Sequence, residues 1–218
     1  MNQRGKLLNL LVSKALKIGE FSLVSGLKTG YYIDLKQVSF DPLGFRLLGR
    51  LLYEEVKKSA VDSCGGVESG GIPLVSAVIS HSFKRVESYR GFFVRREARK
   101  HGLKQWIVGC FQSEDKVIVL EDVITTGNSA YAACRKIEEC DGRIVKILTV
   151  VNREEPMIQP LVEGEYEVTS LFSLSELVRA YQDIAPDRVS ALEKKEDPNK
   201  IEDSAHRGKE QDTNQKDT

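Results

Sequence analysis

The chain lacks three features that would place it in a membrane, outside the cell or on a nucleic acid. No stretch of its 218 residues is apolar for the length of a membrane span, and the leucine-rich first 17 residues carry charges throughout. No two cysteines have Cys-x-x-Cys spacing, so we expect reduced, mostly structural thiols. Basic and acidic residues are equal at 32 each, so no charge excess favours nucleic acid. We therefore expect a cytoplasmic protein with no nucleic-acid or membrane partner.

The C-terminal residues 186–218 lack the apolar content of a folded segment. Between positions 193 and 218 only Ile201 and Ala205 are apolar, and no aromatic residue occurs. Such a stretch buries too little surface to offset its ordering entropy, so we expect a charged, disordered tail. The rest is long enough for one medium domain. We expect an N-terminal hood at 1–40, made of a helix and short strands, and a core at 41–185.

The most informative stretch is 117–129. Its first four residues are apolar without alternation, which predicts a parallel strand buried on both faces. Glu121 and Asp122 follow, then a turn of small hydroxyl residues around Gly127, and then a predicted helix at 130–140. Ligands of open α/β sheets bind at strand carboxyl ends, and helix N-termini bind anions. The adjacent acids suit a sugar diol, a metal ion or both, and ordinary helix capping does not explain them.

Two further segments favour a phosphorylated ligand. Four glycines at 65–71 predict a turn and favour close approach of the backbone to a ligand; a turn that only connects a strand to a helix is the plain alternative, and the pattern alone is a weak signal. The loop at 95–102 contains Arg95, Arg96, Arg99 and His101 and ends in His-Gly. A solvated surface loop is the plain alternative. Because a phosphate-type turn follows about twenty residues later, we interpret the loop as a cationic cover for a polyanionic group.

Predicted helices alternate with predicted strands along the chain. The helices are expected at 2–18, 42–61, 74–83, 130–140 and 175–181, and the strands at 20–24, 31–35, 91–95, 116–121, 143–151 and 166–172. This order predicts an α/β fold with a mostly parallel central sheet flanked by helices.

Several of these segments resemble the type I phosphoribosyltransferase family. Residues 117–129 resemble its thirteen-residue signature for phosphoribosyl pyrophosphate. Residues 21–32, 66–73, 95–102 and 152–154 resemble the hood, pyrophosphate loop, catalytic loop and base-binding strand end of its orotate branch. The resemblance covers residues 1 to about 185, with all segments in the family's order. It implies the type I phosphoribosyltransferase fold with a small N-terminal hood.

The resemblance also implies a reaction and a set of site residues. The implied enzyme joins orotate to the ribose of phosphoribosyl pyrophosphate, giving orotidine 5′-monophosphate and pyrophosphate in pyrimidine biosynthesis. The implied cofactor is Mg²⁺, held mainly by the substrate, and the implied assembly is a homodimer that shares the catalytic loop. The implied catalytic residues are Arg99, His101 and Asp122. Those for phosphoribosyl pyrophosphate are Arg95, Arg96, Arg99, His101, Glu121, Asp122, Val123, Ile124, Thr125, Thr126, Gly127, Asn128 and Ser129. Those for orotate are Thr125, Arg153, Tyr32 and Ile33.

Some positions depart from the family pattern. Arg96 and Arg99 stand where members often have lysine, and Gly70 and Val24 stand where some members have lysine. Two other functions remain open: a phosphoribosyltransferase for a purine base, and a non-catalytic sensor of phosphoribosyl pyrophosphate. Arg153 argues against a purine, which has no carboxylate to pair with. The cationic loop and the intact acid pair argue against a sensor.

Overall fold

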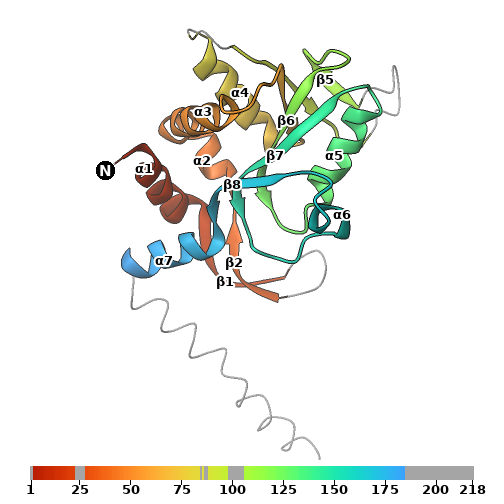
Figure 1. The fold of residues 1–218 in the computed structure, drawn as a ribbon. Coiled ribbons are helices and arrows are strands. Elements are labelled where there is room, and N and C mark those ends of the chain that lie inside the picture. Colours follow the sequence, from red (N-terminus) through yellow and green to blue (C-terminus); the bar gives the residue numbers. More distant parts are fainter. Residues whose placement is uncertain (1, 23–27, 84, 86–87, 98–105, 185–218) are drawn as a thin grey trace, which may run out of the picture. The chain divides into compact units, whose positions relative to one another are not determined.

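The computed structural model describes residues 2–22, 28–83, 85, 88–97 and 106–184, and its main element is a six-stranded sheet (Figure 1). The strand order is β5 (Ile107–Gly109), β4 (Arg90–Val94), β3 (Ser63–Val67), β6 (Lys116–Ile124), β7 (Arg143–Asn152) and β8 (Val168–Ser173). All neighbours are parallel except β4 and β5, which are antiparallel. The predicted α/β class with a mostly parallel sheet is confirmed. The predicted tail lies outside the described residues.

Helices cover both faces of this sheet. One face packs against α3 (Pro42–Val56) and α4 (Gly71–Ser82), and the other against α5 (Asn128–Glu138) and α6 (Gln159–Val162) (Figure 1). In β6, Ile118 and Leu120 belong to the first apolar cluster, and Val117 and Val119 belong to the second. The apolar run at 117–120 is therefore buried on both faces, as predicted, because a central parallel strand has no solvent-facing side.

The N-terminal segment is less helical than predicted. Helix α1 (Gln3–Leu10) continues as a π-helical turn (Leu11–Ala15), and β1 (Leu16–Ser22) begins where the predicted helix should have continued. Leu16 pairs with Ile33, and Ile18 pairs with Tyr31, in the antiparallel strand β2 (Lys28–Ile33). The prediction was wrong here because these apolar residues also fit a strand's period of two. A short helix, α2 (Lys36–Ser39), follows.

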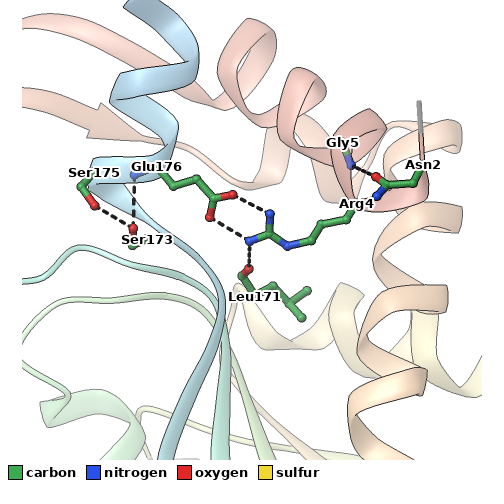
Figure 2. Close-up of polar contacts among 7 residues, drawn as sticks. All are labelled: Asn2, Arg4, Gly5, Leu171, Ser173, Ser175 and Glu176. Atoms are coloured by element: carbon green, nitrogen blue, oxygen red, sulfur yellow. Dashed lines mark hydrogen bonds and ion pairs between the residues drawn. The ribbon is translucent and has the colours of Figure 1, made fainter.

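The residues expected to form a hood share the main apolar cluster with the sheet. Leu7 and Leu11 belong to the same buried cluster as Leu120. Arg4 joins α1 to α7 (Leu174–Ile184): its Nη2 donates to a Glu176 carboxylate oxygen and to the Leu171 carbonyl oxygen, both at 2.8 Å (Figure 2). This contact pins the first helix to the end of β8.

The predicted glycine-rich turn is shorter than expected: it covers residues 68–70 and contains Gly70, and the other three glycines lie in the two flanking elements. Gly65 and Gly66 belong to β3, and Gly71 starts α4, three residues before the predicted helix at 74. A Cβ atom on Gly65 would lie 2.6 Å from the Phe92 ring. Glycine is therefore needed in this strand for close packing, which a sequence pattern alone cannot distinguish from a turn.

Other boundaries differ by a few residues. Helix α3 ends at Val56, not near 61, and Asp41 caps it as predicted by accepting from the Leu43 and Gly44 N–H groups at 3.0 and 2.9 Å. The short elements β5 and α6 were not predicted. All four cysteines are free thiols, two of them buried. Within the described ranges, every helix is too short or too polar to cross a membrane.

Candidate functional site

The residues predicted to bind a phosphorylated sugar surround one cavity at the carboxyl end of β6. The cavity has a volume of about 180 Å³ and is lined by residues 121–130 together with Arg96. Strand β6 extends to Ile124, so Glu121 and Asp122 lie inside the strand and not after its predicted end. The structure thus brings together the whole predicted turn, both acids and one cation of the basic loop. Arg99 and His101 lie outside the described residues.

The turn at the cavity floor has a shape that its glycine permits. Gly127 has φ +84°, the left-handed region, and a Cβ atom there would clash with Leu161. The Thr126 carbonyl oxygen accepts from the Ile158 N–H at 2.9 Å, and the Asn128 Nδ2 donates to the Thr126 hydroxyl at 3.0 Å. No described side chain caps α5, so the N–H groups of its first turn remain available to an anion.

The two adjacent acids lie in different environments. Glu121 is only 5% exposed, and its Oε2 has no hydrogen-bond partner among the described residues. Burial and the neighbouring Asp122 raise the pKa of Glu121 well above its usual value, which favours the neutral acid. Asp122 is more exposed and accepts from the Val123 N–H at 2.9 Å. The Asp122 carboxylate also occupies the space that a side chain at position 70 would need. Glycine at this position therefore leaves room for Asp122.

The start of the basic loop is held by β3 and α5. Arg96 donates from its backbone N–H to Glu68 Oε2 at 3.0 Å and from Nε to the Glu68 carbonyl at 2.8 Å. Lys136 of α5 donates to the carbonyl of Arg95 at 2.9 Å and lies 3.7 Å from the centre of the Trp106 ring. These contacts border a second cavity, of about 230 Å³, that shares Arg96 with the first.

Sequence reasoning missed Lys136. The available signal was its position on α5, four and eight residues after Ala132 and Asn128, on the face that borders the cavities. Burial lowers the pKa of Lys136 from its ordinary value. Its hydrogen bond to the Arg95 carbonyl fixes the first residues of the basic loop relative to α5.

The residues predicted to bind orotate lie at the end of β7 and in β2. Arg153 joins the ends of β6 and β7 because its N–H donates to the Ile124 carbonyl at 2.9 Å. Its side chain is 9% exposed and forms an ion pair with Glu155, with 2.9 Å between Nη2 and Oε1. Tyr32 is 41% exposed, whereas Ile33 is 8% exposed and belongs to the core. The Ile33 side chain is therefore not available to a ligand.

Glu154 anchors the segment that carries Arg153. It has φ +59°, and its carboxylate accepts from the Ser175 N–H at 2.8 Å and from the Ser175 hydroxyl at 3.0 Å. The Ser175 hydroxyl is hydrogen-bonded to the Ser173 hydroxyl, which also accepts from the Glu176 N–H (Figure 2). Glu154 and Glu155 were not distinguished by the sequence, because adjacent glutamates on a loop give no signal for which partner each selects.

The chain is similar to known proteins over most of its length. No family model matches it. It is 38% identical over 181 residues to the orotate phosphoribosyltransferase of Aquifex aeolicus (strain VF5), spanning 82% of this chain and 99% of that protein. It is 35% identical over 165 residues to the one of Methanosarcina mazei, spanning 76% and 86%. Among solved structures, the Mycobacterium tuberculosis H37Rv enzyme in complex with 5-phospho-alpha-D-ribosyl 1-diphosphate has a TM-score of 0.67 and 26% identity, over 81% of this chain and 99% of that one.

Proposed function

Because the chain belongs to the orotate phosphoribosyltransferase family, we propose that it transfers the 5-phosphoribosyl group of phosphoribosyl pyrophosphate to N1 of orotate. The products are orotidine 5′-monophosphate and pyrophosphate, a step of pyrimidine biosynthesis in the cytoplasm. The observation that carries the proposal is the cavity at the end of β6. One continuous segment supplies its acid pair, its small-residue turn and an uncapped helix N-terminus.

The 5′-phosphate binds at the turn of residues 125–129. The backbone N–H groups at the start of α5 point their positive dipole end toward the cavity, and the hydroxyl groups of Thr125, Thr126 and Ser129 add donors. Gly127 lets the backbone approach the phosphate closely. Val123, Ile124 and Asn128 complete the lining of the cavity.

Glu121 and Asp122 bind the ribose hydroxyl groups. The raised pKa of Glu121 favours its protonated form, which both donates and accepts a hydrogen bond, and the Asp122 side chain offers acceptor oxygens beside it; together they suit a diol. The described residues contain no group of three or more side chains that could hold a metal ion. The Asp122 side chain, with the Glu121 carboxyl group beside it, would suit a Mg²⁺ that takes most of its oxygen ligands from the substrate, as this ion commonly does. Such an ion would neutralise charge on the pyrophosphate.

The leaving pyrophosphate is neutralised by the basic loop. Arg96 lines the cavity, Arg95 lines the neighbouring one, and we assign Arg99 and His101 to the same role from their place in the loop. Guanidinium groups pair with phosphate oxygens in bidentate fashion. We propose that in a homodimer the part of the loop that carries Arg99 and His101 serves the partner subunit's site, whereas Arg96 lines the cavity of its own chain. We include Arg99, His101 and Asp122 as the catalytic residues.

Orotate lies between the ends of β6 and β7. Arg153 pairs with its carboxylate, Thr125 contacts it from the cavity wall, and Tyr32 with the backbone of Ile33 packs near its ring. The charge of orotate is on its carboxylate, so the proton on N1 leaves as the bond to the ribose carbon forms, and an oxygen of the departing pyrophosphate accepts it. Positioning and electrostatic stabilisation of the positive ribose carbon then supply most of the rate.

A spectrophotometric assay tests this function. The purified protein is mixed with phosphoribosyl pyrophosphate, Mg²⁺ and orotate, and the loss of orotate absorbance is followed. Orotate turnover is the expected result. Turnover with adenine, guanine or hypoxanthine in place of orotate identifies a purine enzyme. Binding of phosphoribosyl pyrophosphate without turnover of any base identifies a sensor.

A further inference from the structure

Arg153 already has a carboxylate beside it before any ligand binds. The Glu155 Oε1 lies 2.9 Å from the Arg153 Nη2, and the two side chains are 29% and 9% exposed. At this distance and burial the pair is poorly screened by solvent. The guanidinium that we assign to the orotate carboxylate is therefore part of a pair whose summed charge is zero.

The backbone holds Glu155 at this place. Arg153 is fixed to β6 through the Ile124 carbonyl, and Glu154 is fixed to the first turn of α7 through Ser175. The Glu154 N–H also donates to the Asn152 side chain at 2.8 Å. Glu155 lies between Glu154, which these hydrogen bonds hold, and Pro156, whose ring restricts the backbone. The pairing thus follows from a constrained loop and not from a freely swinging surface side chain.

A carboxylated ligand brings a second negative charge to the same guanidinium. Arginine has five donors, so it can contact two carboxylates at once, but the two anions repel each other across it. The repulsion weakens the binding of orotate and of its nucleotide and leaves ligands without a carboxylate unaffected. We propose that Glu155 is a specificity-determining residue that limits the affinity of Arg153 for carboxylated pyrimidines, favouring product release. This inference rests on the proposed function.

The substitution Glu155→Gln separates charge from position. Glutamine has the same size, and its amide oxygen still accepts a hydrogen bond from Arg153, so the guanidinium keeps its place. Only the negative charge is removed. We expect the KM for orotate to fall about tenfold, the lower end of what one nearby charge does to an ionisation equilibrium. The dissociation constant of orotidine 5′-monophosphate falls by a similar factor, and that of uridine 5′-monophosphate, which lacks the carboxylate, stays unchanged.

Glu55→Gln is the matched control. It removes the same charge from an ion pair with Lys58 near the C-terminal end of α3, just before β3 begins. This pair therefore precedes a strand, whereas Arg153 follows the carboxyl end of β7. Kinetics with orotate and calorimetric titration with the two nucleotides are measured for the wild-type protein and both variants. The control should match the wild type in all of them.

The outcomes separate this inference from the proposed function. If wild-type protein turns over orotate but Glu155→Gln leaves the orotate KM unchanged or raises it, Glu155 only positions Arg153, and the inference is overturned alone. An equal gain in affinity for both nucleotides also overturns it, because the effect would not depend on the carboxylate. If the wild-type protein does not turn over orotate, the proposed function fails and the inference fails with it.

Discussion

The ends of the neighbouring strands β6 and β7 solve the problem of binding an anion in opposite ways. At the end of β6, the proposed site for the phosphate consists of backbone N–H groups and hydroxyl groups, and no described side chain caps the helix start. At the end of β7, the proposed binding group for orotate is the side chain of Arg153, which is paired with Glu155 in the structure. The first end is open to an anion, and the second holds an anion of its own.

This difference indicates which end of the site contributes affinity for a phosphate and which end discriminates between ligands by their charge. A backbone site costs little to leave empty, because water solvates its N–H groups, and it accepts any phosphate of the right size. Burying a guanidinium without a partner costs free energy of folding. The Glu155 carboxylate beside Arg153 offsets this cost. The orotate carboxylate must then compete with the Glu155 carboxylate for Arg153 or share the guanidinium with it. Binding at this end therefore depends on the charge of the ligand. Substitutions at each end should therefore have separate effects on the two substrates.

The largest effect is expected from Arg153→Ala. The variant loses the partner of the orotate carboxylate and leaves the Glu155 charge uncompensated beside it. We expect the KM for orotate to rise about a hundredfold, equivalent to about 2–3 kcal/mol, a usual value for hydrogen bonds to charged groups. The KM for phosphoribosyl pyrophosphate should change by less than about threefold, since its site is built by β6 and α5. Steady-state kinetics with each substrate varied in turn give both constants.

A double variant sharpens this result. Arg153→Ala combined with Glu155→Gln removes the stranded charge and should recover part of the orotate affinity. Equal rises in both KM values for the single variant would contradict the separation of the two ends.

Gly127→Ala should have the next largest effect, now on the phosphate end. The residue has φ +84°, and the new Cβ would clash with Leu161. We expect the kcat/KM for phosphoribosyl pyrophosphate to fall about tenfold or more, with a loss of about 1–3 kcal/mol in the free energy of unfolding. Denaturant titration and kinetics measure the two quantities.

Gly164→Ala is the control for the backbone contribution. Gly164 has φ +81°, and a Cβ there would have no atom within 4 Å. It should lose about 1 kcal/mol of stability from the left-handed backbone and retain full activity. If both variants lose activity equally, the phosphate site does not depend on the shape of the turn at Gly127.

A smaller effect is expected from the pH dependence of stability. Glu121 is buried and forms no ion pair among the described residues, unlike Glu155. Burial and Asp122 raise its pKa well above the ordinary 4.5, and Arg96 offsets part of this rise. The folded protein therefore holds this proton more tightly than the unfolded chain does. The free energy of unfolding should fall as pH rises from the ordinary pKa toward the raised one, by at most about 1.4 kcal/mol per pH unit.

Glu121→Gln should remove this loss. The melting temperature of the variant, measured between about pH 5 and about pH 8, should fall less with pH than that of the wild type. The variant should be the more stable protein at the upper end and should bind phosphoribosyl pyrophosphate less well. Parallel curves for the two proteins would mean that Glu121 ionises normally.

The sequence alone determined the features that depend on neighbours in the chain. The run at 117–120 predicted a strand buried on both faces, the residues after it predicted a turn and helix that line one cavity, and Asp41 predicted a helix start. Strand and helix periods, capping side chains and glycine turns act over a few residues, so the sequence records them directly. The α/β class follows from their alternation.

Only the tertiary structure decided features that depend on distant partners. Gly65 lies in a strand because Phe92 packs against it, Leu16 begins a strand because Ile33 pairs with it, and the Ile33 side chain points into the core. The sequence likewise left open which glutamate caps α7 and which pairs with Arg153. Long-range packing overrides local preference because burial and pairing energies exceed the small differences between helix, strand and turn propensities.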